Sequence, residues 1–203
     1  MKTNAVEKAL GALGSAQVAV SDHATRGFHL NVTVNPEEVV RAAEVLDAEG
    51  FFIEAVTGVD WLGEQEALAK EAAKKAAAAQ KAAEAAAAAT AEQGGGEEGA
   101  ASPPEPADEA EAAGQGQEPA EDSFEVVYDF NHFQQLCRVT VRTRVPRSNP
   151  ELPTISTVYP GADWHEREAH DFFGLIFTGH PDLSPLLLPE DADFHPLRKD
   201  YKP

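Results

Sequence analysis

The sequence contains a single cysteine, Cys137, among its 203 residues. A lone thiol cannot form a disulfide within the chain. It also cannot supply the several thiolates that an iron–sulfur cluster or a structural zinc site requires. Cys137 lies in a stretch with strand-like alternation, where it is most simply a small core residue. The chain is therefore expected to hold no cysteine-bound metal centre of its own.

Long hydrophobic runs and recognisable catalytic motifs are also missing. No stretch approaches the roughly 18 apolar residues that would suggest a membrane-spanning helix. The polar start of the chain, residues 1–8, has no secretory apolar core. There is no glycine-rich phosphate loop, nucleophile elbow or Cys–His dyad. These absences favour a cytoplasmic binding or scaffold protein that would reach a membrane indirectly, through a partner.

Positive charge is scarce, with 16 Lys and Arg residues against 35 Asp and Glu residues and a formal net charge of −19. No basic stripe is available to neutralise phosphates, so nucleic acid is not an expected partner. Residues 64–122 carry 14 acidic and four basic side chains, which is about half of the net charge. The acidic character of the rest suggests either a basic protein partner or solubility alone.

The composition changes abruptly within residues 64–122. The first part, to about residue 90, is alanine with Lys and Glu, which favours a helix that has no large apolar face. The second part is rich in Gly, Pro, Glu, Gln and Ala, a composition typical of disorder. We predict a low-complexity insertion, disordered or partly helical. A solvated tether without chemistry is the favoured interpretation, and a tether for an additional partner is the alternative.

The block before the insertion, residues 1–63, has the pattern helix, strand, strand, helix, strand. The helices begin at a capping box of Asn4 and Glu7 and at Asn35, which is followed by Pro36. The second helix carries Val39, Ala43 and Leu46 on one face and ends at Gly50. The strands are predicted at Gln17–Val20, at Gly27–Val34, where Phe28, Leu30, Val32 and Val34 share a face, and at Phe51–Val56.

The block after the insertion, residues 123–203, begins with a predicted hairpin. Its strands run from Phe124 to Phe130 and from Cys137 to Val145, joined by a loop at Asn131–Gln135. Arg138, Arg142 and Arg144 share one face and are expected to pair with Glu125 and Asp129 across the hairpin. An acidic partner is the alternative for these arginines. The chain then returns through Thr154–Val158 to a helix that Asp163 caps, with Glu166 in the reciprocal position.

Together the two blocks predict one α+β domain of roughly 140 residues, large enough for its own core. We expect a mostly antiparallel or mixed sheet of four to five strands with helices packed on one face. The long insertion interrupts this domain. If the strands around the helix after Asn35 are parallel neighbours, their connection should be right-handed.

The predicted helix after Asp163 carries Glu166, Arg167, Glu168, His170 and Asp171 beside Trp164, Phe172 and Phe173. The spacing of His165 and His170 differs from the zinc-protease pattern H-E-x-x-H, since five residues turn a helix by about 140°. Glu166 and His170 could share a metal, but an i,i+4 hydrogen bond is the simpler interpretation. Ion pairs are therefore favoured over acid–base chemistry, with Arg167 beside Asp171 and Arg198 as a partner for Glu168 and Asp171. We expect Trp164 to be buried.

Two segments resemble the C subunit of proton-pumping NADH:quinone oxidoreductase, bacterial complex I. They are Glu166–Leu183, with the pattern E-R-E-x-x-D-x-F-G-x-x-F-x-G-H-P, and His195–Tyr201, which contains H-P-L-R-K-D. The similarity extends through Leu188–Asp191, Val158–Trp164, Phe124–Tyr128 and Val56–Leu62. His170 departs from the pattern, because an aromatic residue is expected there, and the alanine-rich insertion is not typical.

The resemblance implies a cofactor-free, non-catalytic subunit of the hydrophilic arm, on the cytoplasmic side of the bacterial inner membrane. Its partners would be the D subunit and the quinone-proximal iron–sulfur subunit, not a second copy of itself, and flavin and iron–sulfur clusters would lie on partner subunits. The whole complex would transfer electrons from NADH to a quinone such as ubiquinone, coupled to proton transport. The residues that the resemblance assigns to fixing the subunit in that arm are Glu166, Arg167, Glu168, Asp171, His195, Arg198 and Lys199. The interface or structural motif that we expect also includes Trp164, His170, His180 and Asp200. Equivalent subunits of membrane-bound hydrogenases or ferredoxin-fed quinone reductases remain the alternative, as does a stand-alone acidic interaction module.

Overall fold

The computed structural model describes residues 3–64, 67, 74 and 122–202. Residues 1–62 and 121–203 form one compact unit, which is described below. The predicted disorder of the insertion, residues 64–122, falls almost wholly outside the described residues. The helices are α1 (Thr3–Leu10), α2 (His23–Arg26), the 3-10 helix η1 (Pro36–Glu38), α3 (Val39–Ala48) and α5 (Ala162–Phe173). The strands are β1 (Gln17–Val20), β2 (Leu30–Thr33), β3 (Phe52–Asp60), β4 (Ser123–His132), β5 (Cys137–Pro146), β6 (Glu151–Pro153) and β7 (Ile176–Thr178).

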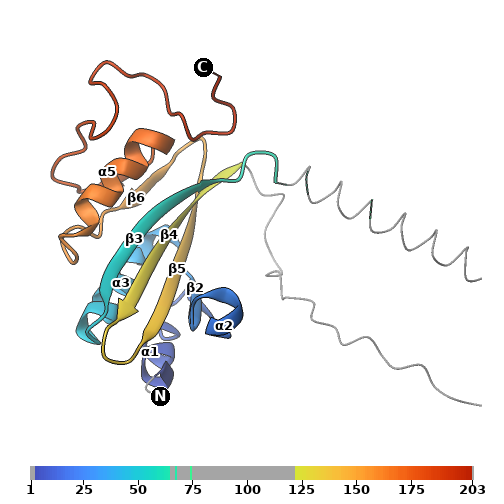
Figure 1. Cartoon of the computed structure of the whole chain (residues 1–203), viewed down its shortest axis with the longest axis vertical. Helices are drawn as coiled ribbons and strands as arrows, with labels where there is room; N and C mark the ends of the chain where they lie inside the picture. Colours follow the sequence, from blue (N-terminus) through green and yellow to red (C-terminus); the bar gives the residue numbers. More distant parts are fainter. Residues whose placement is uncertain (1–2, 65–66, 68–73, 75–121, 203) are drawn as a thin grey trace, which may run out of the picture. The chain divides into compact units, whose positions relative to one another are not determined.

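The main sheet has five strands in the order β1-β2-β5-β4-β3, and β6 pairs with β7 in a small second sheet (Figure 1). The β1–β2, β4–β5 and β3–β4 pairs are antiparallel, whereas β2 and β5 are parallel. The α+β class and the mixed sheet predicted from sequence are confirmed. The strands on either side of α3 are not neighbours, because β5 and β4 lie between β2 and β3.

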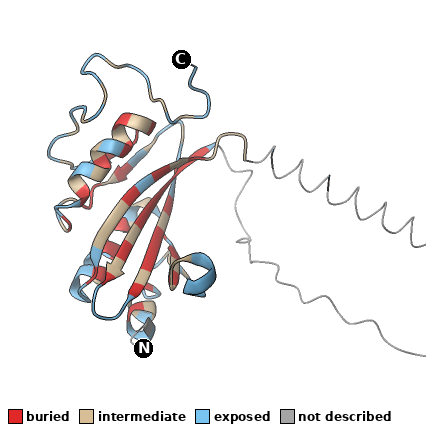
Figure 2. Ribbon diagram, in the orientation of Figure 1, coloured by how far each residue is buried: buried red, intermediate tan, exposed pale blue. Residues whose placement is uncertain are grey.

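One face of the main sheet carries the core. Its side chains come from alternate positions of each strand, and they share one apolar cluster with the inner faces of α1, α3 and α5. Figure 2 shows much of β4 and β5 as buried, with intermediate residues between the buried ones. The fully buried members of greatest volume on the sheet are Phe124, Tyr128 and Phe130 of β4 and Leu30 of β2. Leu46 of α3 is equally buried, and Val39 and Ala43 beside it confirm the predicted inner face of that helix.

The predicted pairing of the hairpin arginines is found for one of them. Arg142 lies 3.4 Å from Glu125, as expected. Arg138 instead forms a 2.7 Å ion pair with Glu54 of β3, and Asp129 accepts a hydrogen bond from Thr140. The prediction that the hairpin alone would satisfy its arginines was therefore incomplete, because β3 lies beside β4 and supplies a further carboxylate.

Several predicted boundaries were wrong for local reasons. Asn4 lies inside α1, which begins at Thr3, so it does not cap that helix. Asn35 has the extended backbone of a cap, but its side chain makes no capping bond, and a 3-10 turn precedes α3. The predicted hairpin loop is shorter, because β4 continues to His132. The return strand is β6, at Glu151–Pro153, three residues before the predicted start.

The insertion interrupts a hairpin between β3 and β4. The two strands pair in register up to Asp60 and Phe124, and the N–H of Trp61 donates to the carbonyl of Ser123 over 2.9 Å. The chain thus leaves the sheet and returns to it at adjacent positions, which a short turn can also join.

We predict that replacing residues 64–122 with a short Gly/Ser loop leaves the fold intact. A shorter flexible loop loses less entropy on closure, so stability should be unchanged or higher, by up to about 2 kcal/mol. The check is the free energy of unfolding from urea titration of both chains. A loss of several kcal/mol would mean that the replaced residues pack on the domain.

Candidate functional site

The charged helix α5 begins at Ala162, with Gly161 before it, and ends at Gly174, whose φ of 71° is the left-handed conformation that favours glycine. Asp163 lies inside the first turn and does not cap the helix, contrary to the prediction from sequence. Its negative charge still suits the positive end of the helix dipole. Figure 1 shows α5 alongside β3, with the C-terminal tail passing beyond it.

Glu166 is fully buried on the inner side of α5. Its carboxylate accepts a hydrogen bond from the Thr154 hydroxyl and another, over 2.8 Å, from the N–H of Ile155. Burial raises the pKa of Glu166 to about 7, and the two hydrogen bonds offset only part of that effect. Nε2 of His180, whose side chain is fully buried, lies 3.8 Å from the same carboxylate and has no hydrogen-bond partner.

Asp171 is the second buried carboxylate of α5. One of its oxygens accepts three backbone N–H groups, from Leu186, Leu187 and Leu188, over 2.7 to 3.2 Å. Burial alone would raise the pKa of Asp171. The three hydrogen bonds have the larger effect, so the pKa of Asp171 lies below its usual value. Asp171 thereby holds a segment that has no regular secondary structure of its own.

Arg167 binds the same irregular segment, so the predicted pairing of Arg167 with Asp171 was wrong. Its guanidinium donates to the carbonyls of Ser184, over 3.0 and 3.2 Å, and Pro185, over 3.3 Å. The predicted Glu166–His170 bond does not form either, because Nδ1 of His170 contacts the carbonyl of Leu175 over 2.7 Å. These side chains bind backbone groups, which carry no recognisable sequence signal.

The tail is fixed to the C-terminal end of α5. Nδ1 of His195 lies 2.8 Å from the carbonyl of Asp171, and Nε of Arg198 donates to the carbonyl of Phe173 over 2.7 Å. Arg198 therefore does not pair with the carboxylates of α5, which corrects the prediction from sequence. A Cβ on Gly174 would collide with both His195 and Arg198, so glycine is required there for packing as well as for its backbone.

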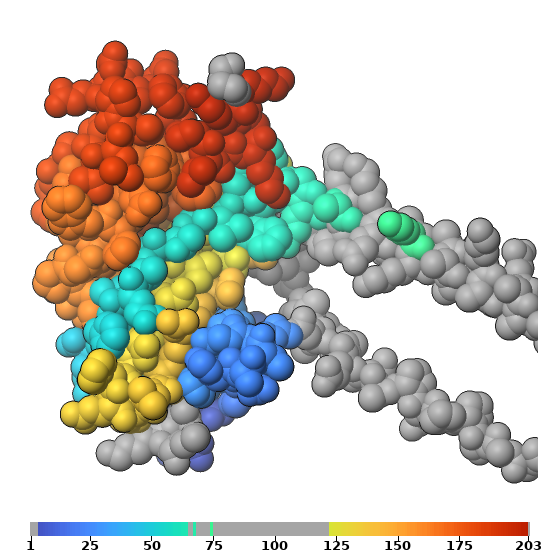
Figure 3. Space-filling model, in the orientation of Figure 1, coloured from blue at the N-terminus to red at the C-terminus, as the bar shows by residue number. Residues whose placement is uncertain are grey.

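A second ionic cluster joins the tail to the sheet. Arg147 forms two hydrogen bonds with the buried Asp60, of 2.9 and 3.0 Å, and contacts Asp200 over 2.8 Å. The N–H of Lys199 also donates to Asp60, over 2.9 Å, and its ammonium reaches the carbonyl of Leu62. Figure 3 shows the tail lying against α5 and reaching the adjoining end of β3. Burial raises the pKa of Asp60, but the bonds from Arg147, Lys199 and Leu62 bring it below its usual value.

Three residues of these clusters were not singled out by any sequence pattern: Thr154, Asp60 and Arg147. Asp60 lies in Val56–Leu62, one of the segments that carry the family resemblance, so a signal was present there. Thr154 and Arg147 had no such signal, because their carboxylate partners lie 12 and 87 residues away in the chain.

Trp164 and Glu168 are the outward-facing residues of the motif. Trp164 is 65% exposed, so the expectation that it would be buried was wrong. The buried residues of α5 are Ala162, Glu166, Ala169, Asp171 and Phe173, and Trp164 faces away from most of them. Glu168 is exposed, and the described residues offer its carboxylate no hydrogen bond or ion pair. The motif therefore divides into inward residues that hold the chain together and outward residues that are free to meet another surface.

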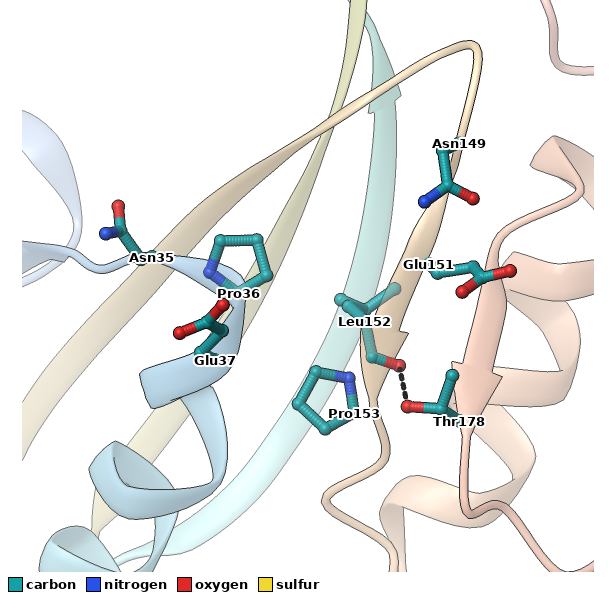
Figure 4. Close-up of a pocket in the computed structure, with 8 residues that line it drawn as sticks. All are labelled: Asn35, Pro36, Glu37, Asn149, Glu151, Leu152, Pro153 and Thr178. Carbon is teal, nitrogen blue, oxygen red and sulfur yellow. Dashed lines mark hydrogen bonds between the residues drawn. The ribbon is translucent and has the colours of Figure 1, made fainter.

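The structure contains two hollows near these elements. One, of about 440 Å³, lies between η1 and β6, and Figure 4 shows Glu37 on one side and Glu151 on the other. The Glu151 carboxylate points away from Pro36, so the two acids do not converge on a shared ligand. The second, of about 280 Å³, lies between β3 and α5. Within the described part of the chain, no group of three or more His, Cys, Asp or Glu residues is arranged to hold a metal, and no helix is long and apolar enough to cross a membrane.

The fold is similar to those of solved structures, of which two are described here. A trypsin-resistant fragment of Nqo5 superposes with a TM-score of 0.54 and 24% identity, covering 90% of this chain and all of the fragment. A chain of the archaeal membrane-bound sulfane sulfur reductase superposes with a TM-score of 0.60 and 20% identity, covering 98% of this chain and 85% of the other. These similarities define the class of fold.

Sequence comparison finds relatives of the second half of the chain. Residues 106–203 match the family described as respiratory-chain NADH dehydrogenase, 30 Kd subunit. The C subunit of NADH-quinone oxidoreductase from Roseiflexus sp. (strain RS-1) is 48% identical over 85 residues, 42% of this chain and 47% of that protein. The same protein of Herpetosiphon aurantiacus is 49% identical over 78 residues, 38% of this chain and 46% of that protein. The matched region thus spans about half the length of these relatives, and the resemblance seen in the sequence is confirmed.

The buried Glu166 predicts that stability falls as pH rises. Its pKa of about 7, against an ordinary value of 4.5, means that the folded state keeps a proton that the unfolded chain releases. The free energy of unfolding should then decrease from about pH 5 to pH 8, by roughly 2–3 kcal/mol. In Glu166→Gln this decrease should vanish, which urea titrations at several pH values will show. Exposed Glu44 supplies the control, Glu44→Gln, and parallel pH profiles for wild type and Glu166→Gln would contradict the prediction.

Arg147→Ala should destabilise the chain by about 3 kcal/mol, because it leaves the buried carboxylate of Asp60 without its cation. The control is Arg41→Ala, since Arg41 is 64% exposed and 3.8 Å from its acidic neighbour Glu38. Thermal unfolding measures both changes. Equal stability of the two variants would show that Lys199 and Leu62 alone satisfy Asp60.

Proposed function

We propose that this chain is a cofactor-free subunit of the peripheral arm of an NADH:quinone oxidoreductase and that it docks the D subunit. The match of residues 106–203 to the 30 Kd subunit family supports the type of complex. The observation that carries the docking role is the division of the α5 motif. Glu166, Arg167 and Asp171 are engaged within the chain, whereas Trp164 and Glu168 face outward without partners among the described residues. A large exposed aromatic beside an unpaired charge is typical of an interface.

The proposed role is structural rather than chemical. NADH oxidation, electron transfer to the quinone and proton translocation would take place on other subunits, which would hold the flavin and the iron–sulfur clusters. Besides the D subunit, the quinone-proximal iron–sulfur subunit is the proposed neighbour. The association with the cytoplasmic side of the inner membrane would follow from these partners. His180, His195, Arg198, Lys199 and Asp200 would act indirectly, by holding the loops and the tail around α5.

A related candidate is an equivalent subunit in a membrane-bound complex with another electron donor. The fold shared with a chain of the archaeal sulfane sulfur reductase is compatible with such a complex. The donor site would lie on a different subunit, so the composition of the purified assembly distinguishes the two candidates. Flavin-binding NADH-input subunits would favour the first.

We predict that the affinity-tagged full chain co-purifies from solubilised membranes with a D-like subunit, and that Trp164→Ala weakens this recovery. Because Trp164 is 65% exposed, its removal should change the stability of the free chain by less than about 0.5 kcal/mol. The measurements are mass spectrometry of the purified assembly and thermal unfolding of the free chain. Phe133→Ala is the matched control, since Phe133 is 82% exposed in the turn between β4 and β5.

Recovery of the wild-type chain without any respiratory subunit would refute the proposed function. Normal recovery of Trp164→Ala would leave the function standing but remove Trp164 from the interface.

A further inference from the structure

Strand β3 is an edge of the main sheet and has unpaired backbone groups. Residues 55–60 pair in register with β4, and Trp61 donates to Ser123 at the end of this ladder. Antiparallel pairs alternate, so the intervening residues Val56 and Gly58 direct their N–H and C=O groups away from β4. Val56 is only 5% exposed and Gly58 is buried, yet among the described residues none forms a hydrogen bond with these outward groups.

The outward side of β3 opens into the hollow of about 280 Å³ that α5 borders. Its lining includes the small residues Ala55 and Ala169, which leave space between strand and helix, and Gly58, against which the ring of Phe173 packs. Gly58 is needed for this arrangement, because a Cβ there would lie 2.6 Å from the ring of Phe173. Leu197 of the tail, 53% exposed, contributes a further apolar side.

One unpaired negative charge borders this apolar hollow. Glu168 is among its lining residues and is exposed, whereas Glu166 and Asp171 of the same helix are buried and hydrogen-bonded. His165 is the other titratable residue of the lining. An apolar surface beside one free carboxylate is complementary to an apolar side chain with a Lys or Arg close to it.

We propose that the hollow between β3 and α5 receives an extended segment of a neighbouring subunit, which adds a strand to β3. The backbone of that segment would pair with Val56 and Gly58, and one of its apolar side chains would fill the space beside Ala169. A Lys or Arg of the segment would meet Glu168. This is the strand-addition mode of recognition, in which the backbone gives affinity and side-chain pockets give specificity. The inference rests on the proposed function, because the neighbour is taken to be a subunit of the same complex.

Charge argues against a second copy of this chain as the occupant. The chain carries a net charge of −19. Self-association at this hollow would also bring two Glu168 carboxylates together, which like-charge repulsion opposes. A basic segment from a different protein has no such penalty.

The test combines amide exchange with assembly, using the full chain. Hydrogen–deuterium exchange is measured on the free chain and on the purified complex. Exchange at the amides of Val56 and Gly58 should slow by about tenfold or more on assembly, as expected when an unpaired edge donor gains a hydrogen bond.

The second measurement uses two variants. Glu168→Arg reverses the charge beside the hollow, and Thr57→Trp places a large side chain at its opening. Each should reduce recovery of the complex by about tenfold while the free chain stays folded, and Glu44→Arg, at an exposed position of α3, is the matched control.

The possible results separate this inference from the proposed function. Normal assembly of both variants, with no change in the two amides, would overturn the strand-addition inference and leave the proposed function intact. Protection of the same amides in a homodimer of the isolated chain would overturn the choice of occupant. If the wild-type chain recovers no respiratory subunit, the proposed function fails and the neighbouring-subunit assignment fails with it.

Discussion

The irregular chain around α5 has backbone N–H groups that regular secondary structure cannot satisfy, and two carboxylates of that helix provide acceptors for four of them. Asp171 accepts three, from Leu186 to Leu188, and Glu166 accepts one, from Ile155. The N–H of the fully buried Ile155 must be paired within the protein, and the three bonds to Asp171 fix the course of the half-buried to exposed segment Leu186–Leu188. The last turn of α5 then offers its free carbonyls to His195 and Arg198, which places the tail. The helix thus organises both the segment before it and the segment after it.

The two carboxylates show why the number and type of donors decide the charge state of a buried acid. Both are desolvated, which disfavours ionisation. A hydrogen bond to a charged group contributes about 1.5–3 kcal/mol, so three N–H donors outweigh the desolvation of Asp171. Glu166 is buried more completely and has one N–H and one hydroxyl, and desolvation prevails there. A proton on Glu166 removes the need for a compensating cation beside this buried carboxyl group.

The sequence predicted the elements better than the contacts. Period-two alternation found the strands of the central hairpin, because burial of one face imposes that pattern wherever a strand forms. It did not predict that β5 would separate β2 from β4, since strand order depends on non-local pairing. The charged helix was located correctly, but its partners were not. Arg167, Asp171 and Arg198 all bind backbone groups of distant segments, and a backbone acceptor or donor looks the same at every residue. The burial of Trp164 was predicted wrongly, because an aromatic residue at the start of a helix can face the core or the solvent and composition does not distinguish the two.

The two motifs that carry the family resemblance, one on α5 and one in the tail, meet at one place in the structure. The N–H of Leu197 donates to the carbonyl of Phe172, and the neighbouring Arg198 binds the carbonyl of Phe173. Leu197 and α5 therefore border the same hollow beside β3. An edge strand invites unwanted pairing unless another element covers or restricts it. Here the tail and α5 restrict access to β3, so in the proposed strand addition a segment would have to match the hollow in size and charge before it could pair with the strand. The tail motif, on this argument, serves recognition by building one side of that opening, even though its own charged residues are occupied within the chain.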